Sequence, residues 1–155
     1  MSLDHRPGSD SGPLRRELDV ERTTAHYLYA ISTLSKESSG RVTTGAIQEY
    51  LDVAPPSVTE MIGKLDDRGL VEYEKYRGVQ LTDQGKILAS NVSWRLCVVS
   101  SFFDSVLDTY LDERTAFDIG FTLPEEGVSR LRERMETTCL DICPEAGHHE
   151  SGCPA

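Results

Sequence analysis

The residues best suited to do chemistry lie near the C-terminus, where three of the four cysteines and two of the four histidines fall within fifteen residues. These residues are Cys139, Cys143, His148, His149 and Cys153. Thiolates bind soft or borderline metals, so the group could hold an Fe–S cluster, Zn(II) or Cu(I), with Cys97 or a histidine as the fourth ligand. The spacing lacks the paired C-x2-C units of a zinc finger. A reversible thiol–disulfide switch and unliganded side chains therefore remain alternatives.

A second set of polar residues lies on the outer face of a predicted helix whose inner face is apolar at 3.6-residue spacing. The helix begins at Pro55 and Pro56, where a missing N–H costs least. The outward positions are Ser57, Thr59, Glu60 and Lys64. Hydroxyls can meet phosphates or base edges, Glu60 can accept from cytosine N4, and proline rings can touch thymine methyl groups. This pattern predicts a surface that reads DNA.

The elements around this helix match that prediction. An apolar stripe over 46–51, with Thr43 or Thr44 as its cap, predicts a short helix before it. After Gly69, alternating apolar residues over 71–81 predict a hairpin with a basic and aromatic tip. Helix, helix and hairpin in this order form a winged helix-turn-helix. Lys64, Lys75 and Arg77 are then placed to contact phosphates, and Arg77 could enter the minor groove.

The rest of the chain is predicted to be helical. A helical period over 14–36 predicts a helix that packs under the winged helix-turn-helix, which we call the head. A long helix is predicted from about residue 83 to about 110, and shorter helices over 113–123 and 124–135. The apolar face of the long helix is broader than one small head can cover, which predicts a homodimer. The expected divisions are a tail (1–13), a winged helix-turn-helix domain (14–82), a helical dimerisation domain (83–138) and a Cys/His-rich tail (139–155).

The net charge of −10 at first argues against a DNA-binding protein, but −7 of it falls in residues 83–155. The chain has 12 Arg against 4 Lys, and high acidity with little Lys indicates adaptation to concentrated salt. There the Debye length falls to roughly 3 Å at 1 M, so repulsion from phosphate is screened. The absence of a long apolar run predicts a cytoplasmic protein with no membrane partner. No phosphate loop, nucleophile elbow or metalloprotease motif indicates an enzyme.

The segments PPSVTEM, RGLVEYE and YRGVQLT, with Gly85 after them in register, resemble the diphtheria toxin repressor and manganese transport regulator (DtxR/MntR) family of metal-dependent repressors. The resemblance covers residues 22–110 well and the later segments in outline. It implies a winged helix head, a helical dimerisation region, a double-stranded DNA operator as partner, and control of DNA binding by Mn(II) or Fe(II).

The metal ligands of the family do not carry over. The resemblance places them at His26, Tyr29, Leu96, Phe117, Gly120 and Phe121. Leucine, phenylalanine and glycine offer no side-chain lone pair, so a site of six oxygen and nitrogen ligands cannot form there. By analogy with a family that responds to iron, we favour an Fe–S cluster held by the C-terminal cysteines over zinc.

The sequence thus predicts a homodimeric DNA-binding transcriptional regulator, mainly α with a small β-hairpin, that senses iron, Fe–S status or redox state through its C-terminal cysteines. Three alternatives remain: a ligand-independent DNA-binding protein, a thiol–disulfide redox switch, and an interaction protein that docks a partner through its acidic C-terminal half.

Overall fold

The computed structural model describes residues 13–38 and 40–135, with side chains described from residue 21 onward. Over these residues the chain forms six helices and one two-stranded antiparallel sheet, which confirms the predicted mainly helical fold with a small hairpin. The elements are α1 (Pro13–Glu37), α2 (Thr44–Leu51), α3 (Pro55–Asp67), β1 (Val71–Glu74), β2 (Gly78–Leu81), α4 (Asp83–Leu107), α5 (Glu113–Thr122) and α6 (Glu125–Arg134).

The helix-turn-helix forms where local sequence signals agree with burial. The hydroxyl of Thr43 accepts the N–H of Ala46 at 3.1 Å and caps α2, as predicted. Asp52 ends α2 in the left-handed conformation at φ 52°, and Pro55 begins α3 directly after the short connection. The inner faces of the two helices pack against α1 and the hairpin in one hydrophobic core. Its fully buried side chains include Leu28, Ile31, Ile47, Val58, Ile62 and Leu65.

The hairpin is the wing of the fold. Its pairing runs from Val71 opposite Leu81 to Glu74 opposite Gly78. Val42 adds a bridge, because its N–H and carbonyl both bond Val79 at 2.8 Å. The sequence places a turn at Arg77 and Gly78, but in the structure Gly78 is the first residue of β2. It has a φ of +103°, and a Cβ there would lie 2.5 Å from the Val42 carbonyl oxygen. Close approach of the two backbones is why a glycine occupies this position.

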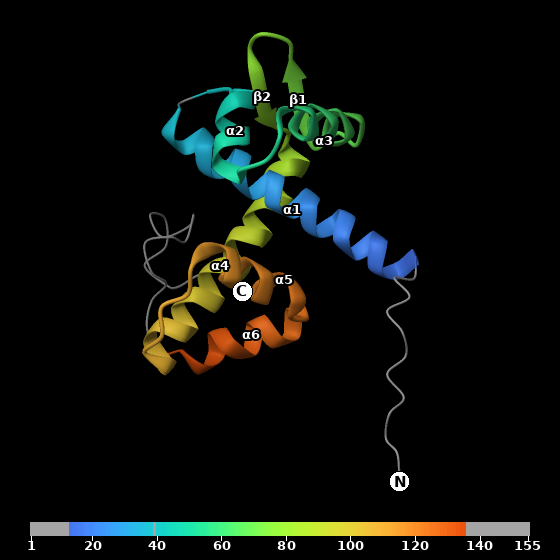
Figure 1. The fold of residues 1–155 in the computed structure, drawn as a ribbon. Coiled ribbons are helices and arrows are strands. Elements are labelled where there is room, and N and C mark those ends of the chain that lie inside the picture. Colours follow the sequence, from blue (N-terminus) through green and yellow to red (C-terminus); the bar gives the residue numbers. More distant parts are fainter. Residues whose placement is uncertain (1–12, 39, 136–155) are drawn as a thin grey trace.

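The long helix α4 links the head to the helices that follow. Thr82 caps its start by accepting the N–H of Gly85 at 3.2 Å. Figure 1 shows α2, α3 and the hairpin at one end of the molecule, with α5 and α6 packed around the far end of α4. Two hydrophobic clusters join these elements: one includes Leu96, Val99 and Phe117, and the other includes Val98 and Val128. Much of the broad apolar face of α4 is therefore buried within the same chain.

Part of that face stays exposed. Val106 and Leu107, in the last turn of α4, are 49% and 50% exposed, and Tyr110 is 87% exposed. Tyr110 lies beyond the helix and not within it as predicted, because Asp108 ends α4 in the left-handed conformation. Among the described helices, none combines the length and the apolar character needed to cross a membrane.

Candidate nucleic-acid interface and metal site

The outer face of α3 presents all six residues predicted from the sequence. Pro55 and Pro56 occupy the first turn, and each of the six side chains belongs to an exposed residue. The hydroxyl of Thr59 donates to the carbonyl of Pro55 at 3.3 Å, so part of its hydrogen-bonding capacity is used within the helix. Ser57 lies in the first turn, with its backbone N–H bonded to the Ala54 carbonyl at 3.0 Å. The start of α3 therefore offers a polar, solvent-facing surface of the kind that a DNA groove accepts.

The charged residues of this face form a pair. Lys64 Nζ lies 2.7 Å from Glu60 Oε1, four residues earlier on the same helix. The hydrogen bond from Lys64 and its positive charge lower the pKa of Glu60. Both side chains are largely exposed, so the pair contributes little to stability and can open toward a phosphate or a base.

The turn of the wing is basic and aromatic, as predicted. Tyr76 is 94% exposed and adopts a φ of 66°. Lys75 Nζ lies 5.2 Å from the centre of the Tyr76 ring, and Arg77 pairs with Glu74 at 3.2 Å. In Figure 1 the turn between β1 and β2 extends beyond α2 and α3. Both basic side chains are exposed where a second groove or the DNA backbone would meet them.

Sequence reasoning missed Arg41 as part of the wing. Its guanidinium donates to the carbonyls of Glu72 and Gly78 at 3.2 and 3.4 Å and lies 3.4 Å from the Glu74 carboxylate. No local pattern marks Arg41, because its place beside the wing depends on the bridge between Val42 and Val79. Arg41 thus ties the segment before α2 to both strands of the wing, with its charge paired to Glu74.

The positions aligned with the family's metal ligands do come together in space. The rings of His26 and Phe117 stack with centroids 4.5 Å apart, and Phe117 lies 6.2 Å from Phe121. Leu96, Phe117, Gly120 and Phe121 also line one residual cavity of about 10 Å³. A single water needs about that volume, so a hydrated or six-coordinate ion does not fit. The convergence supports the alignment, while the chemistry of the side chains does not suit a divalent metal.

One imidazole is the sole nitrogen ligand among these aligned positions. Burial disfavours the charged form and lowers the pKa of His26; the charges around it partly cancel, with Glu113 and Asp118 raising that pKa and Arg114 and Arg22 lowering it. Within the part of the chain that the structure describes, no group of three or more His, Cys, Asp or Glu side chains could hold a metal ion. The residues present do not fit the Mn(II) or Fe(II) site that the family implies.

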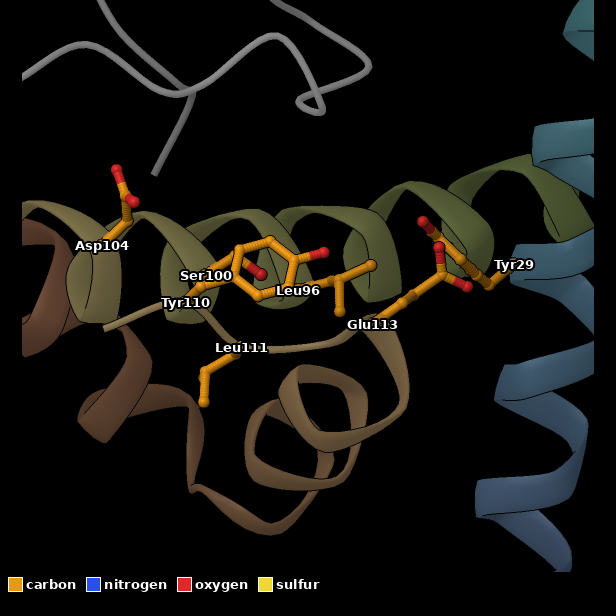
Figure 2. Close-up of a pocket in the computed structure, with 7 residues that line it drawn as sticks. All are labelled: Tyr29, Leu96, Ser100, Asp104, Tyr110, Leu111 and Glu113. Carbon is orange, nitrogen blue, oxygen red and sulfur yellow. The ribbon is translucent and has the colours of Figure 1, made fainter. Parts of the chain in front are cut away.

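A polar junction lies beside this apolar centre. The hydroxyl of Tyr50 on α2 donates to Glu113 Oε1 at 2.7 Å, and Tyr29 on α1 also hydrogen-bonds Glu113. Burial is the larger cause, and the Glu113 carboxylate the smaller one, of the raised pKa of the Tyr29 and Tyr50 hydroxyls. Both hydroxyls therefore stay protonated and act as donors. Figure 2 shows Tyr29 and Glu113 meeting at one end of a cavity of about 210 Å³, with Leu96 and Tyr110 along it. Sequence reasoning missed this junction, because its members are far apart along the chain.

Five of the six predicted thiol and imidazole ligands lie outside the described residues. They are Cys139, Cys143, His148, His149 and Cys153. Cys97 is described: it is 1% exposed on α4, with Sγ 4.0 Å from the Ser101 hydroxyl oxygen.

Comparisons with known proteins agree with this geometry. Residues 19–79 match the family described as iron dependent repressor, N-terminal DNA binding domain. An HTH-type transcriptional regulator MntR from Oceanobacillus iheyensis is 41% identical over 70 residues, 45% of this chain and 48% of that protein. An uncharacterised HTH-type transcriptional regulator of Methanocaldococcus jannaschii is 32% identical over 121 residues, 76% of this chain and 95% of that protein.

Solved structures give the same picture. The manganese regulator SloR superposes with a TM-score of 0.62 at 30% identity, covering 71% of this chain and 52% of SloR. The IdeR of T. acidophilum superposes with a TM-score of 0.66 at 20% identity, covering 74% of this chain and 55% of that protein, which supports the fold alone. The chain thus spans about half the length of MntR and of these structural neighbours. The relatives are transcriptional regulators and not enzymes. This chain belongs to the DtxR/MntR family of metal-dependent transcriptional regulators.

Proposed function

We propose that the chain is a homodimeric regulator that binds a double-stranded DNA operator through α3 and the wing. The observation that carries this proposal is the exposed outer face of α3 beside a basic wing tip. Direct readout falls to the start of α3, with Ser57 and Glu60 toward base edges. Lys64, Lys75 and Arg77 contact phosphates. We propose residues 14–82 as the DNA-binding domain and 83–138 as the dimerisation domain.

The exposed apolar residues at the end of α4 support a dimer. Val106, Leu107 and Tyr110 present apolar surface to solvent in one chain, next to the helix that joins the head to α5 and α6. A two-fold dimer would place two heads on half-sites about 34 Å apart, one turn of DNA, and so raise affinity. Binding of operator DNA would also place the protein in the cytoplasm.

Affinity for DNA tests this proposal. Duplexes enriched from a random pool in molar KCl, the condition that the acidic composition favours, provide the probe. Arg77→Ala is expected to weaken binding about 5-fold to 10-fold and to reduce the slope of log affinity against log salt by about 0.9. Arg130→Ala on α6, an exposed arginine outside the head, is the matched control and should change neither quantity. If the unmodified protein and both variants bind DNA with equal affinity, the wing does not contact DNA as proposed.

We further propose that the C-terminal cysteines carry the sensor, as an Fe–S cluster or, alternatively, a zinc site or a thiol switch. Two observations support this proposal. The positions aligned with the family's metal ligands are lined by apolar side chains, and Cys139, Cys143 and Cys153 are close in sequence. Thiolates are the ligands that such metals prefer.

The cluster proposal predicts a brown protein after anaerobic purification, with absorption between about 300 and 600 nm from sulfide-to-iron charge transfer. Iron, sulfide and zinc are counted per chain. Replacing Cys139, Cys143 or Cys153 by Ser should remove the colour, and Cys97→Ser tests the fourth ligand. A colourless, metal-free protein that still binds DNA would exclude the cluster and leave a thiol switch or a ligand-independent DNA-binding protein.

A further inference from the structure

We propose that direct side-chain contacts at the family's metal position hold the head in its DNA-binding arrangement, so that operator binding needs no Mn(II) or Fe(II) at that place. This inference rests on the proposed DNA-binding function. It concerns what positions the head, and it leaves open which signal the C-terminal cysteines transmit.

Two contacts join α1, which runs through the head, to α5. The first is the stack of His26 on Phe117, which is 4% exposed, with ring centroids 4.5 Å apart. The second is an ion pair between Arg22, one turn before His26 on α1, and Asp118, the residue directly after Phe117 on α5. Together they fix both the separation and the rotation of α1 relative to α5.

A third contact reaches the helix-turn-helix itself. Tyr50 lies on α2, next to the reading helix, and its hydroxyl donates to Glu113 at the start of α5 at 2.7 Å. Tyr50 also packs against both main hydrophobic clusters, the one in the head and the one around Leu96 and Phe117. A rotation of the head away from α5 would break this bond and expose the shared apolar surface. We call the three contacts His26–Phe117, Arg22–Asp118 and Tyr50–Glu113 the clasp.

The clasp differs from a metal-bound junction in how its side chains interact when no cation is present. Carboxylates that converge on one ion repel each other until the ion binds, because like charges at short range disfavour each other. Here none of the positions aligned with the family's ligands carries a carboxylate. Leu96, Phe117 and Phe121, which lie at three of them, attract each other through burial and aromatic stacking. The clasp is therefore closed without a ligand, and a cation gains nothing by entering a cavity of about 10 Å³.

The first experiment uses the full chain to select duplexes from a random pool in two parallel arms. One arm contains EDTA and the other contains Mn²⁺. The proposal expects the same sequences and equal affinities in the two arms. Selection that succeeds only with Mn²⁺ would overturn it.

A direct measurement of Mn²⁺ binding tests the inference even if the protein binds no DNA. Mn²⁺ is the probe because thiolates select softer metals, so the C-terminal cysteines compete poorly for it. The EPR signal of free Mn²⁺ should keep its full intensity at stoichiometric protein. A stoichiometric loss of that signal would overturn the inference. If no duplex is enriched in either arm, the proposed DNA-binding function fails, and the EPR titration still decides the metal question.

Variants test the clasp as a positioning device. The double variant Tyr50→Phe, Phe117→Ala is expected to bind the selected duplex about 10-fold more weakly, and to lose preference between half-site spacings because the heads are less fixed. Spacing preference is the readout that a general loss of stability would not change, and it is measured where urea titration shows the variant folded. With Tyr50→Phe kept, Phe117→Leu in place of Phe117→Ala should restore most of the spacing preference. Thr122→Val is the control, because the exposed hydroxyl of Thr122 bonds, among the described residues, only the Asp118 carbonyl within α5. Unchanged affinity and spacing preference in the double variant would overturn the proposal.

Discussion

Gly85→Ala is expected to destabilise the protein by about 3 kcal/mol, because a Cβ at this position has no room. It would lie 2.0 Å from the carbonyl oxygen of Leu70 and 3.3 Å from a methyl group of Leu81. That carbonyl already accepts the N–H of Thr82 at 3.1 Å, so neither backbone can move without breaking the junction between the wing and α4. The helix propensity of alanine returns only about 1 kcal/mol. Urea unfolding followed by circular dichroism measures the change.

Gly45→Ala is the matched control for this substitution. Gly45 is an exposed residue of α2, and nothing lies within 4 Å of a Cβ added there. The same change should therefore leave stability unaltered or raise it by up to about 1 kcal/mol. If the two variants unfold at the same urea concentration, the close contact at Gly85 does not exist in solution.

Ser57→Glu is expected to weaken operator binding on the order of 100-fold while the fold stays intact. The substitution places a carboxylate on the exposed face of the first turn of α3, where the proposed interface meets phosphates and base edges. A negative charge is tolerated at a helix N-terminus, so the effect on stability should be neutral or slightly favourable. DNA affinity and urea unfolding, measured on the same preparation, separate the two effects.

Ser90→Glu controls for the added charge. Ser90 is an exposed residue of α4, outside the reading helix and the wing. We expect its DNA affinity to stay within about 2-fold of the unmodified protein, since screening in molar salt confines charge effects to a few ångström. If Ser90→Glu weakens binding as much as Ser57→Glu, net charge and not the α3 surface controls affinity, and the proposed interface is wrong.

The sequence also predicted the failure of the metal site, through residue types alone. No packing can give Leu96 or Phe117 a lone pair, so the conclusion needed only the register of the alignment. The residue types also indicated that apolar core fills the site, but the particular contacts that replaced it could not be predicted. The stack of His26 on Phe117 and the bond from Tyr50 to Glu113 join residues that are more than sixty positions apart in the chain. Pairings at that separation depend on how helices cross, and local patterns carry no such information.

The apolar face of α4 also shows what a sequence pattern cannot specify. Its width correctly indicated burial, and the prediction assigned that burial to a second subunit. The structure covers much of it with α5 and α6 of the same chain and leaves Val106, Leu107 and Tyr110 exposed. A hydrophobic stripe reports how much surface is to be buried and not which surface buries it, because the hydrophobic effect is non-directional.

The sequence by itself determined the local elements of this protein: the cap at Thr43, the proline start of α3, the hairpin and the helical period of α4. Each depends on backbone geometry and on a periodic pattern within about twenty residues, which are properties of the chain before it packs. Only the tertiary structure decided how Arg41 joins the wing, why Gly85 cannot carry a side chain, and which contacts hold the head against α5. These depend on distances between segments remote in sequence, and close packing in three dimensions sets those distances.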